Sequence, residues 1–436
     1  MRFSTLIGVA VATAAFSTAN ADDLLEIYKL AQTKDPIILQ QKALRDSAYA
    51  AIDIADAANL PQINLKGVAQ YNKTNKNDQA TAFIAGGTLS LQQSIWRHSN
   101  FLQSSIAEKN ATSADLAYNN AKQELIVRTS KAYFSVLEAK DLLEFSQANL
   151  KALEQQYNEA NQRFKVGLIA NTDVQEAKAS YDQASANVII ANNKLKNSYE
   201  NLRQITGLLH ANLSHLNIET FSTKELTENA DYWLKTAEEN NLSLQQSMIN
   251  REIAKNKITL AKSGHEPTLD LFGSLNSTHT DYKENNITKV DGTLNTATVG
   301  IELNIPLYSG GATSAEVEKS QQDYIAASET LELTHRTVKT NLYNQFNNIN
   351  ATIGTVNAYK QSVISAESAL KATEAGYQVG TRTIVDVLDA TQRLYNAKSS
   401  LATARYQYIL SWLNLRYTAG ILTEADITSI NDALIK

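Results

Sequence analysis

Apolar residues recur every seven positions in two long stretches of the chain. One row is Val136, Leu143, Leu150, Tyr157 and Phe164, and the other is Ile349, Val356, Val363, Leu370 and Tyr377. A seven-residue period predicts helices that pack as coiled coils. We therefore predict long helices over residues 97–166 and 311–379. Each would be followed by a glycine turn and a return helix of roughly 35 residues.

The two rows belong to two copies of one unit. Adding 213 to a position in the first copy gives its counterpart in the second, so that Val166-Gly167 matches Val379-Gly380 and Asp173-Val174 matches Asp386-Val387. Self-similarity over this distance predicts a two-fold internal repeat. The first copy covers residues 22–210 and the second 230–420. Residues 211–229 connect them, and residues 421–436 form a tail.

Four segments alternate apolar and polar residues with a period of two: 62–73, 88–95, 269–276 and 298–307. The fourth is the clearest, with Val299, Ile301 and Leu303 alternating with polar residues. This alternation is typical of transmembrane β-strands. A half-buried sheet in a soluble protein has the same period. The period therefore predicts strands and leaves both settings open.

Residues 1–21 have the features of a secretory signal peptide. Arg2 precedes an apolar stretch over 6–16, and Ala19-Asn20-Ala21 forms an A-x-A cleavage site. No later stretch is apolar enough to span a bilayer as a helix, so a membrane crossing would have to use strands. Four strands cannot close a membrane barrel, which needs about eight. Copies of the chain would have to share a barrel, and the period does not choose between dimer, trimer and tetramer.

Composition excludes several kinds of chemistry. The chain has no cysteine, which excludes disulfides and thiol catalysis. A net charge of −5 gives no indication of nucleic-acid binding. The six histidines lack metal-ligand spacing beyond His210 and His215, which we interpret as loop residues, and no nucleophile elbow or phosphate loop occurs. We therefore predict that the protein is not an enzyme, and we expect neither a cofactor nor a metal.

One run in the second copy is too specific for a generic coiled coil. Residues 375–391 read AGYQVGTRTIVDVLDAT and residues 394–398 read LYNAK, with counterparts RFKVGL at 163–168 and TDVQ at 172–175. In these motifs, and along essentially the whole mature sequence, the chain resembles the TolC family of outer-membrane efflux and secretion ducts.

The resemblance implies an α+β membrane protein. A homotrimer would share one twelve-stranded transmembrane β-barrel, four strands per chain, continuous with a long α-helical coiled-coil barrel that crosses the periplasm of a Gram-negative cell. In each copy the helix before the strands (37–59 or 230–262) would stack on the return helix. Residues 211–229 and 421–436 would form an equatorial belt.

The same resemblance implies an exit duct of a tripartite export system. Its partners would be two further copies of itself, a periplasmic adaptor, an inner-membrane transporter and outer-membrane lipid. Drugs and toxic small molecules are the expected cargo, and secreted proteins are left open. The alternatives are a dedicated type I protein-secretion duct and, in another class, a periplasmic coiled-coil adaptor, which would not need the four strands.

Asp386 and Asp389 are three residues apart and share a helix face. Asp386 is also three residues after Thr383, the spacing of a helix-capping box. The cap explains Asp386 alone, because a second like charge on the same face is mildly unfavourable. In a trimer the pair would supply six carboxylates, and carboxylate rings select cations. The resemblance places both residues at the narrow periplasmic entrance.

Asp173, Thr172, Tyr377 and Arg382 form a second candidate group. Thr172 could cap a helix with Asp173 in its first turn, and Tyr377 and Arg382 could be ordinary surface residues. The counterpart of Arg382 is Ile169, so this charge is specific to one copy. The resemblance implies that these residues bond between neighbouring coiled coils and hold the entrance shut.

The resemblance also assigns the tip turns to contact with the adaptor. The turn residues are Gly167, Leu168, Gly380 and Thr381.

Overall fold

The computed structural model describes residues 22–74, 80–284 and 287–435, so the predicted signal peptide lies outside the described residues. The chain divides into two compact units. The sheet unit consists of Ile37–Lys122 and Trp233–Leu342. The hairpin unit consists of the described residues up to Pro36, of Gln123–Tyr232, and of the described residues from Tyr343 onward. Within the described ranges, no helix combines the length and apolar character needed to cross a membrane.

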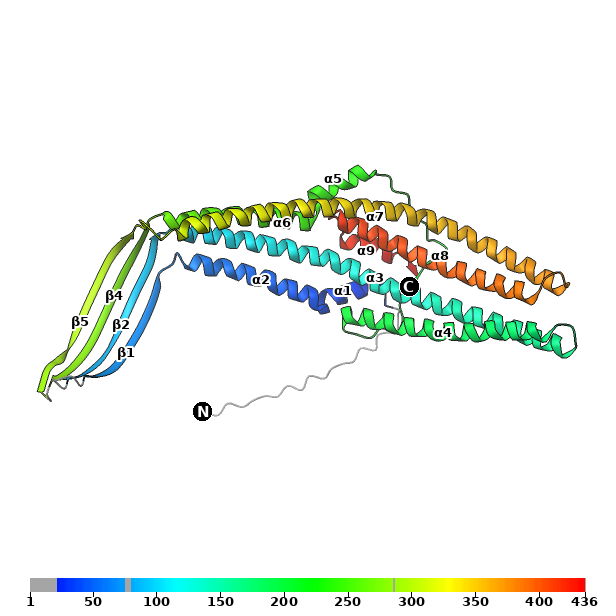
Figure 1. Cartoon of the computed structure of the whole chain (residues 1–436), viewed down its shortest axis with the longest axis horizontal. Coiled ribbons are helices and arrows are strands. Elements are labelled where there is room, and N and C mark those ends of the chain that lie inside the picture. The colour runs from blue at the N-terminus through cyan, green and yellow to red at the C-terminus, as the bar shows by residue number, and fades with distance from the viewer. Residues whose placement is uncertain (1–21, 75–79, 285–286, 436) are drawn as a thin grey trace, which may run out of the picture. The chain divides into compact units, whose positions relative to one another are not determined.

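The sheet unit contains four antiparallel strands in the order β1-β2-β4-β5 (Figure 1). Their bounds are β1 Gln62–Thr74, β2 Ala80–Trp96, β4 Thr268–Glu284 and β5 Ile287–Asn304. The sequence located all four, but β2, β4 and β5 extend well beyond the alternating segments. Pairing between the strands continues through polar residues. For example, Thr278 of β4 pairs with Leu294 of β5. Residues 305–307, which were predicted to end the fourth strand, lie outside β5.

The strand register gathers apolar side chains on one face of the sheet. Leu65 is paired with Leu89, Leu89 with Leu275, and Leu275 with Ala297. Every residue of β1 is exposed, and Leu65 and Val299 are both 79% exposed. Figure 1 shows β1 and β5 at the two edges of the sheet. A single chain therefore leaves both the apolar face and the two edges uncovered.

Helices lead into and out of this sheet. They are α2 Pro36–Ala57, α5 Ala230–Asn240, α6 Leu242–Lys262, the short 3-10 helix η1 Ser263–His265, and the first parts of α3 His98–Lys165 and α7 Ala312–Gln378. The single helix expected over 230–262 is broken at Asn241, whose side chain accepts a hydrogen bond from Leu244 N (3.0 Å) and caps α6. An Arg97–Asp270 ion pair (2.7 Å) ties the beginning of α3 to β4.

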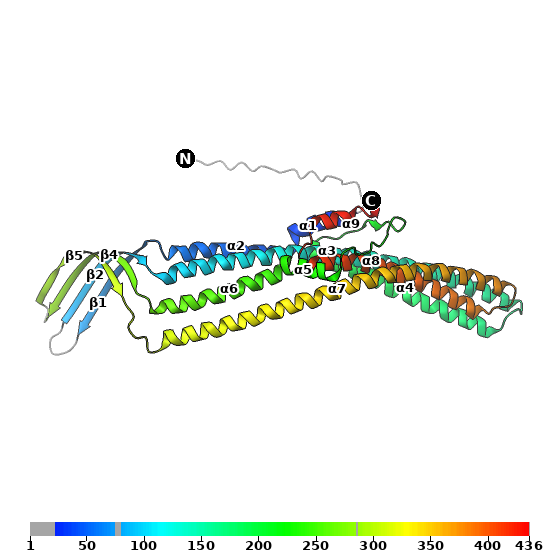
Figure 2. The same cartoon turned by 90° about the horizontal axis from the view of Figure 1, so that it is seen from above.

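The hairpin unit contains two long helical hairpins, which Figures 1 and 2 show side by side. The later part of α3 pairs with α4 (Asn171–Thr206), and that of α7 pairs with α8 (Ile384–Thr418). The return helices have 36 and 35 residues, close to the predicted length. Ala177, Ala184 and Ala191 of α4 are at most 2% exposed. Such a row of small side chains lets neighbouring helices approach closely.

Short elements from distant parts of the chain close the other end of the hairpin unit. They are α1 Leu24–Lys34, β3 His215–Leu216, α9 Glu424–Asn431 and β6 Leu434–Ile435. Asn431 donates to Asp23 (2.9 Å), and β3 pairs with β6. Tyr133 is fully buried and its hydroxyl donates to Ser214 O (2.7 Å), and this burial raises the pKa of Tyr133.

A bidentate ion pair ties α1 to α3. Both outer nitrogens of Arg128 contact the carboxylate of Asp35 at 3.0 Å, and the side chain of Asp35 is 2% exposed. We predict that Asp35→Asn lowers the free energy of unfolding by about 3 kcal/mol, because it removes the buried partner of Arg128. The remaining carboxylate, that of Glu124, is exposed and 3.8 Å away. Urea unfolding followed by circular dichroism measures this loss.

Glu200→Gln is the matched control, because the Glu200–Arg203 pair is exposed on α4. It should change the free energy by less than about 0.5 kcal/mol. Equal effects of the two substitutions would contradict the structural role of Asp35.

Candidate functional site

Both helical hairpins end in the same kind of turn. Gly167 and Gly380 have φ angles of +77° and +80°, in the left-handed region that favours glycine. After the first long helix, Leu168 N donates to Arg163 O (2.9 Å), as in a Schellman motif. The predicted tip residues therefore form two compact turns, and their apolar side chains remain uncovered in one chain. Leu168 is 71% exposed.

The second turn depends on Gly376. Its carbonyl accepts hydrogen bonds from Thr381 N (2.9 Å) and Arg382 N (3.3 Å). The Cβ and Cγ atoms of Arg382 lie against Gly376. A Cβ on Gly376 would lie 2.7 Å from Arg382 Cγ. The first hairpin carries Arg163 at the position of Gly376 and Ile169 at the position of Arg382. The two tips thus have similar backbone turns, but the arginine lies before the turn in the first hairpin and after it in the second.

Asp386 forms the capping box that its spacing predicted. Its Oδ2 accepts hydrogen bonds from Thr383 N and Thr383 Oγ1, both at 2.9 Å, and Asp386 N donates to Thr383 Oγ1 (3.3 Å). These bonds, and the nearby positive charge of Arg382, lower the pKa of Asp386. Asp389 lies one turn further along α8 and is exposed. The cap therefore accounts for Asp386 and gives no role to Asp389.

The other predicted cap is wrong. Helix α4 begins at Asn171 after Ala170 at the N-cap position, so Thr172 lies within the helix. Asp173 is in the first turn, where the helix dipole favours a carboxylate. Among the described residues of one chain, no hydrogen bond or ion pair joins Asp173 to Arg382. A single chain does not bring these two lock candidates together.

Tyr377 is placed differently from an ordinary surface residue. It packs against a buried cluster that includes Leu153, Ala160 and Ile384. The guanidinium of Arg163 lies over its ring, with Cζ 4.5 Å from the ring centroid. Our sequence reasoning did not select Arg163. The sequence does carry a signal for it: Arg163 of the first copy corresponds to Gly376 of the second, and Arg382 of the second corresponds to Ile169 of the first.

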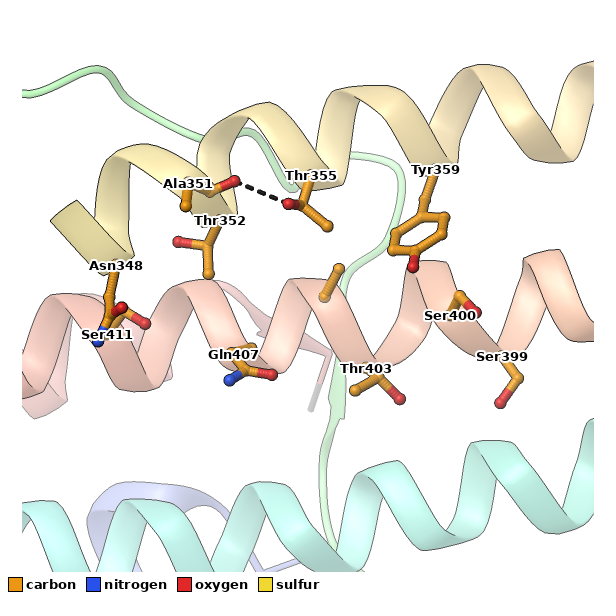
Figure 3. A pocket seen from close by; sticks show the side chains of 11 residues that line it. Asn348, Ala351, Thr352, Thr355, Tyr359, Ser399, Ser400, Thr403, Gln407 and Ser411 are labelled. Carbon is orange, nitrogen blue, oxygen red and sulfur yellow. Dashed lines mark hydrogen bonds between the residues drawn. The ribbon is translucent and has the colours of Figure 1, made fainter.

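A cleft of about 480 Å³ lies between α7 and α8, away from the turns (Figure 3). Its lining is uncharged and rich in hydroxyl groups, including Thr352, Thr355, Tyr359 and Thr403. The hydroxyl of Thr355 donates to Ala351 O at 2.8 Å. These groups provide no acid–base pair. Over the described ranges, no group of three or more His, Asp or Glu side chains could hold a metal.

Comparison with solved structures identifies the fold as that of a TolC-like outer-membrane channel. The CusC channel superposes with a TM-score of 0.79 at 14% sequence identity, covering 93% of this chain and 95% of CusC. The CmeC outer-membrane channel of Campylobacter jejuni gives 0.77 at 14% identity, covering 100% of this chain and 98% of CmeC.

Sequence comparison identifies the family. The model of the outer membrane efflux protein family matches residues 27–208 and 233–420. The chain is 42% identical over 429 residues to outer membrane protein TolC of Escherichia coli K12, covering 96% of this chain and 86% of that protein. It is 28% identical over 446 residues to the proteases secretion protein PrtF of Dickeya chrysanthemi, covering 99% of this chain and 95% of PrtF.

The chain therefore belongs to the outer membrane efflux protein family, and the resemblance to the TolC family is confirmed. It is an outer-membrane efflux or secretion duct with a periplasmic extension. The two relatives described above are an outer membrane protein and a protease secretion protein.

The close approach at Gly376 generates a prediction about the second tip. Gly376→Ala places a methyl group against Arg382 and displaces the turn. We expect the amides of Thr381 and Arg382 to exchange with deuterium at least about tenfold faster, the factor expected when a hydrogen bond of about 1.4 kcal/mol is lost. Hydrogen-exchange mass spectrometry of the tip peptide measures this rate.

Gly354→Ala is the matched control. It makes the same change within α7, and a Cβ at Gly354 meets no atom within 4 Å. Alanine favours a helix by up to about 1 kcal/mol. The control should leave exchange at the tip unchanged, and equal exchange in both variants would contradict the role of Gly376.

Proposed function

We propose that this chain is the outer-membrane exit duct of a tripartite export system and that it works as a homotrimer. The observation that carries the proposal is the four-stranded sheet with two unpaired edges, β1 and β5, and an exposed apolar face. Lipid offers no hydrogen-bond partner to a strand edge. Pairing β5 of one copy with β1 of the next would satisfy both edges and close a barrel of twelve strands.

The helical part extends this arrangement. The two copies within the chain, residues 22–210 and 230–420, would each contribute one hairpin, so that three chains supply six hairpins to a periplasmic helical barrel. Residues 211–229 and 421–436 would form its equatorial belt. In support of the belt, the α9 residue Asn431 bonds to Asp23, and β6 pairs with β3.

The hairpin tips would form the periplasmic entrance. In a trimer, Asp386 and Asp389 would make a ring of six carboxylates that favours cations. Arg382 would bond to Asp173 and Thr172 of a neighbouring chain, with Tyr377 beside them, and hold the entrance shut. The absence of an Asp173–Arg382 bond within one chain is compatible with a bond between chains. Each exposed pair is worth about 0–1 kcal/mol, which suits a lock that must open.

The tip turns would also receive the partner proteins. Gly167, Leu168, Gly380 and Thr381 present exposed backbone and apolar surface to a periplasmic adaptor, which would connect the duct to an inner-membrane transporter. Drugs and toxic small molecules are the cargo we propose first. The relative PrtF is named for the secretion of proteases. A dedicated type I protein-secretion duct is therefore the second candidate.

The edge argument predicts a trimer with a specific cross-link. The protein contains no cysteine, so introduced cysteines are the only thiols. We expect one cysteine at Leu65 of β1, combined in turn with one at Val299, Ile301 or Leu303 of β5, to give in one register a disulfide-linked trimer. Within one chain these edges are about 14 Å apart, too far for a disulfide.

Denaturing gels before and after reduction, together with the mass of the detergent-solubilised protein, measure the result. A cysteine pair at Leu65 and Leu89 is the control, because these residues are neighbours within the sheet and should link only within one chain. A stable monomeric barrel, or a linked dimer as the largest product, would refute the proposed trimer.

The acidic ring predicts a change in ion selectivity. Asp386→Ala combined with Asp389→Ala should leave the trimer intact and weaken both cation selectivity and block by multivalent cations in planar-bilayer recordings. Asp389→Ala alone should retain part of the effect, because it removes three of the six charges and preserves the cap. Asp182→Ala, on the exposed side of α4, is the control for loss of charge. Unchanged selectivity in the double variant would reduce Asp386 to a helix cap.

A further inference from the structure

The first described residues of the chain are bonded into the end of the hairpin unit that α1, β3, α9 and β6 form. Asp22 N donates to Asn212 O (3.0 Å), and Asp22 O accepts a hydrogen bond from Ser214 N (3.1 Å). Asp22 thereby forms an isolated parallel bridge with Leu213. The next residue, Asp23, is buried and its side chain caps α1. The chain is therefore fixed at both of its first described residues.

The side chain of Asp22 begins a row of three polar groups. Its Oδ2 atom lies 2.7 Å from His210 Nδ1, and His210 Nε2 lies 2.9 Å from Thr206 Oγ1. His210 does lie in the loop after α4, as the sequence predicts, but its side chain is only 7% exposed. Carboxylate, imidazole and hydroxyl follow one another as in a catalytic triad. Thr206 is fully buried, however, so no substrate reaches its hydroxyl, and the row instead holds Asp22 in place.

The carboxylates of Asp22 and Asp23 place negative charge at this end of the unit. The buried hydroxyl of Tyr133 lies 3.4 Å from Asp22 O, to which it donates a second, longer hydrogen bond. Burial is the main cause of the raised pKa of Tyr133, and the negative charges of Asp23 and Asp22 raise that pKa further. The charge of both carboxylates is therefore felt inside the unit, and a positive charge beside them is favoured.

The predicted cleavage site of the leader coincides with this fixed position. The A-x-A motif at 19–21 predicts that the mature chain begins at Asp22, and residues 1–21 lie outside the described residues. Hydrolysis of the Ala21–Asp22 peptide bond leaves a carboxylate on the released leader and an α-ammonium group on Asp22. A neutral amide with one N–H donor thus becomes a cation with three donors. This cation forms at the nitrogen that is bonded to Asn212 O.

We propose that this end of the hairpin unit is a binding site for the chain's own mature α-ammonium group, so that removal of the leader strengthens the fold. Asn212 O accepts one of the N–H donors, and the carboxylates of Asp22 and Asp23 supply the opposite charge. A charged donor makes a stronger hydrogen bond than a neutral amide does. A chain that keeps its leader is held more weakly here. This inference rests on the predicted cleavage after Ala21 and is independent of the proposed trimer and its entrance.

Chemical labelling of the protein, expressed with its own leader and purified in detergent, tests this binding. Reductive methylation at pH 7 labels exposed α-amino groups before lysine side chains, because their ordinary pKa is about 8 rather than about 10.4. In the folded protein the α-amino group of Asp22 should react at least about tenfold more slowly than after unfolding in guanidinium, the factor expected for one hydrogen bond to a charged group. Equal rates would overturn the proposal, and so would an intact mass that places the mature N-terminus at another residue.

An extended chain tests what the α-ammonium group contributes to the fold. Gly-Ser-Gly inserted between Ala21 and Asp22 moves the charge three residues away and leaves an amide at Asp22. The amides of residues 212–214 should then exchange with deuterium at least about tenfold faster, because the charged hydrogen bond is lost. The matched control carries the same three residues after Lys436 and should exchange like the wild type. Equal exchange in the mature and extended proteins would overturn the proposal.

Asp22→Asn separates the charge of the α-ammonium group from the bulk of the extension. Asparagine keeps the shape of the side chain and removes its negative charge. If the bound group acts by its charge, the extension should accelerate exchange less in Asp22→Asn than in the wild type, because both changes weaken one interaction. Full additivity would show that the extension acts by its bulk and would overturn the proposal. If the extended chain does not fold, the labelling rates of the wild type decide the matter.

Discussion

Backbone hydrogen bonding at the edges of a β-sheet is the constraint on which the rest of this structure depends. Strands β2 and β4 come from different halves of the chain and pair at the centre, which leaves β1 and β5 without an outer neighbour. Their unpaired N–H and C=O groups cannot be hydrated in a bilayer. The edges, together with the uncovered apolar face, explain why we propose that one chain is only part of a barrel.

The long helices answer a different physical demand. Helices of 68 and 67 residues bury little surface by themselves, so their stability must come from packing along their length. Small side chains such as Ala177 and Ala184 allow that packing at close range. The Arg128–Asp35 pair then fixes α1 against α3 in the same unit. Close packing and a few buried polar contacts thus stabilise the helices of the hairpin unit.

The tips show how two similar backbones can serve different purposes. Both turns use a glycine with positive φ, a requirement that is independent of the neighbouring side chains. Arg163 and Gly376 occupy matching positions, so one tip directs its arginine towards an aromatic ring and the other makes room for Arg382. Asp386 combines two roles in our proposal, since its carboxylate caps α8 and still contributes charge to the entrance.

Patterns within short stretches of sequence determined much of this protein. The heptad rows, the period-two segments, the glycine turns and the Thr383–Asp386 box each depend on residues close in the chain, and the sequence located all of them. The caps at Asn241 and Ala170 are also local, but the sequence analysis did not predict them. The tertiary structure alone decided the full length of the strands and the Arg163–Tyr377 contact. Strand length is set by ladder partners, and the ring–cation contact joins Arg163 to Tyr377, 214 positions later in the chain. Local spacing does not encode such neighbours, because they are brought together only by packing.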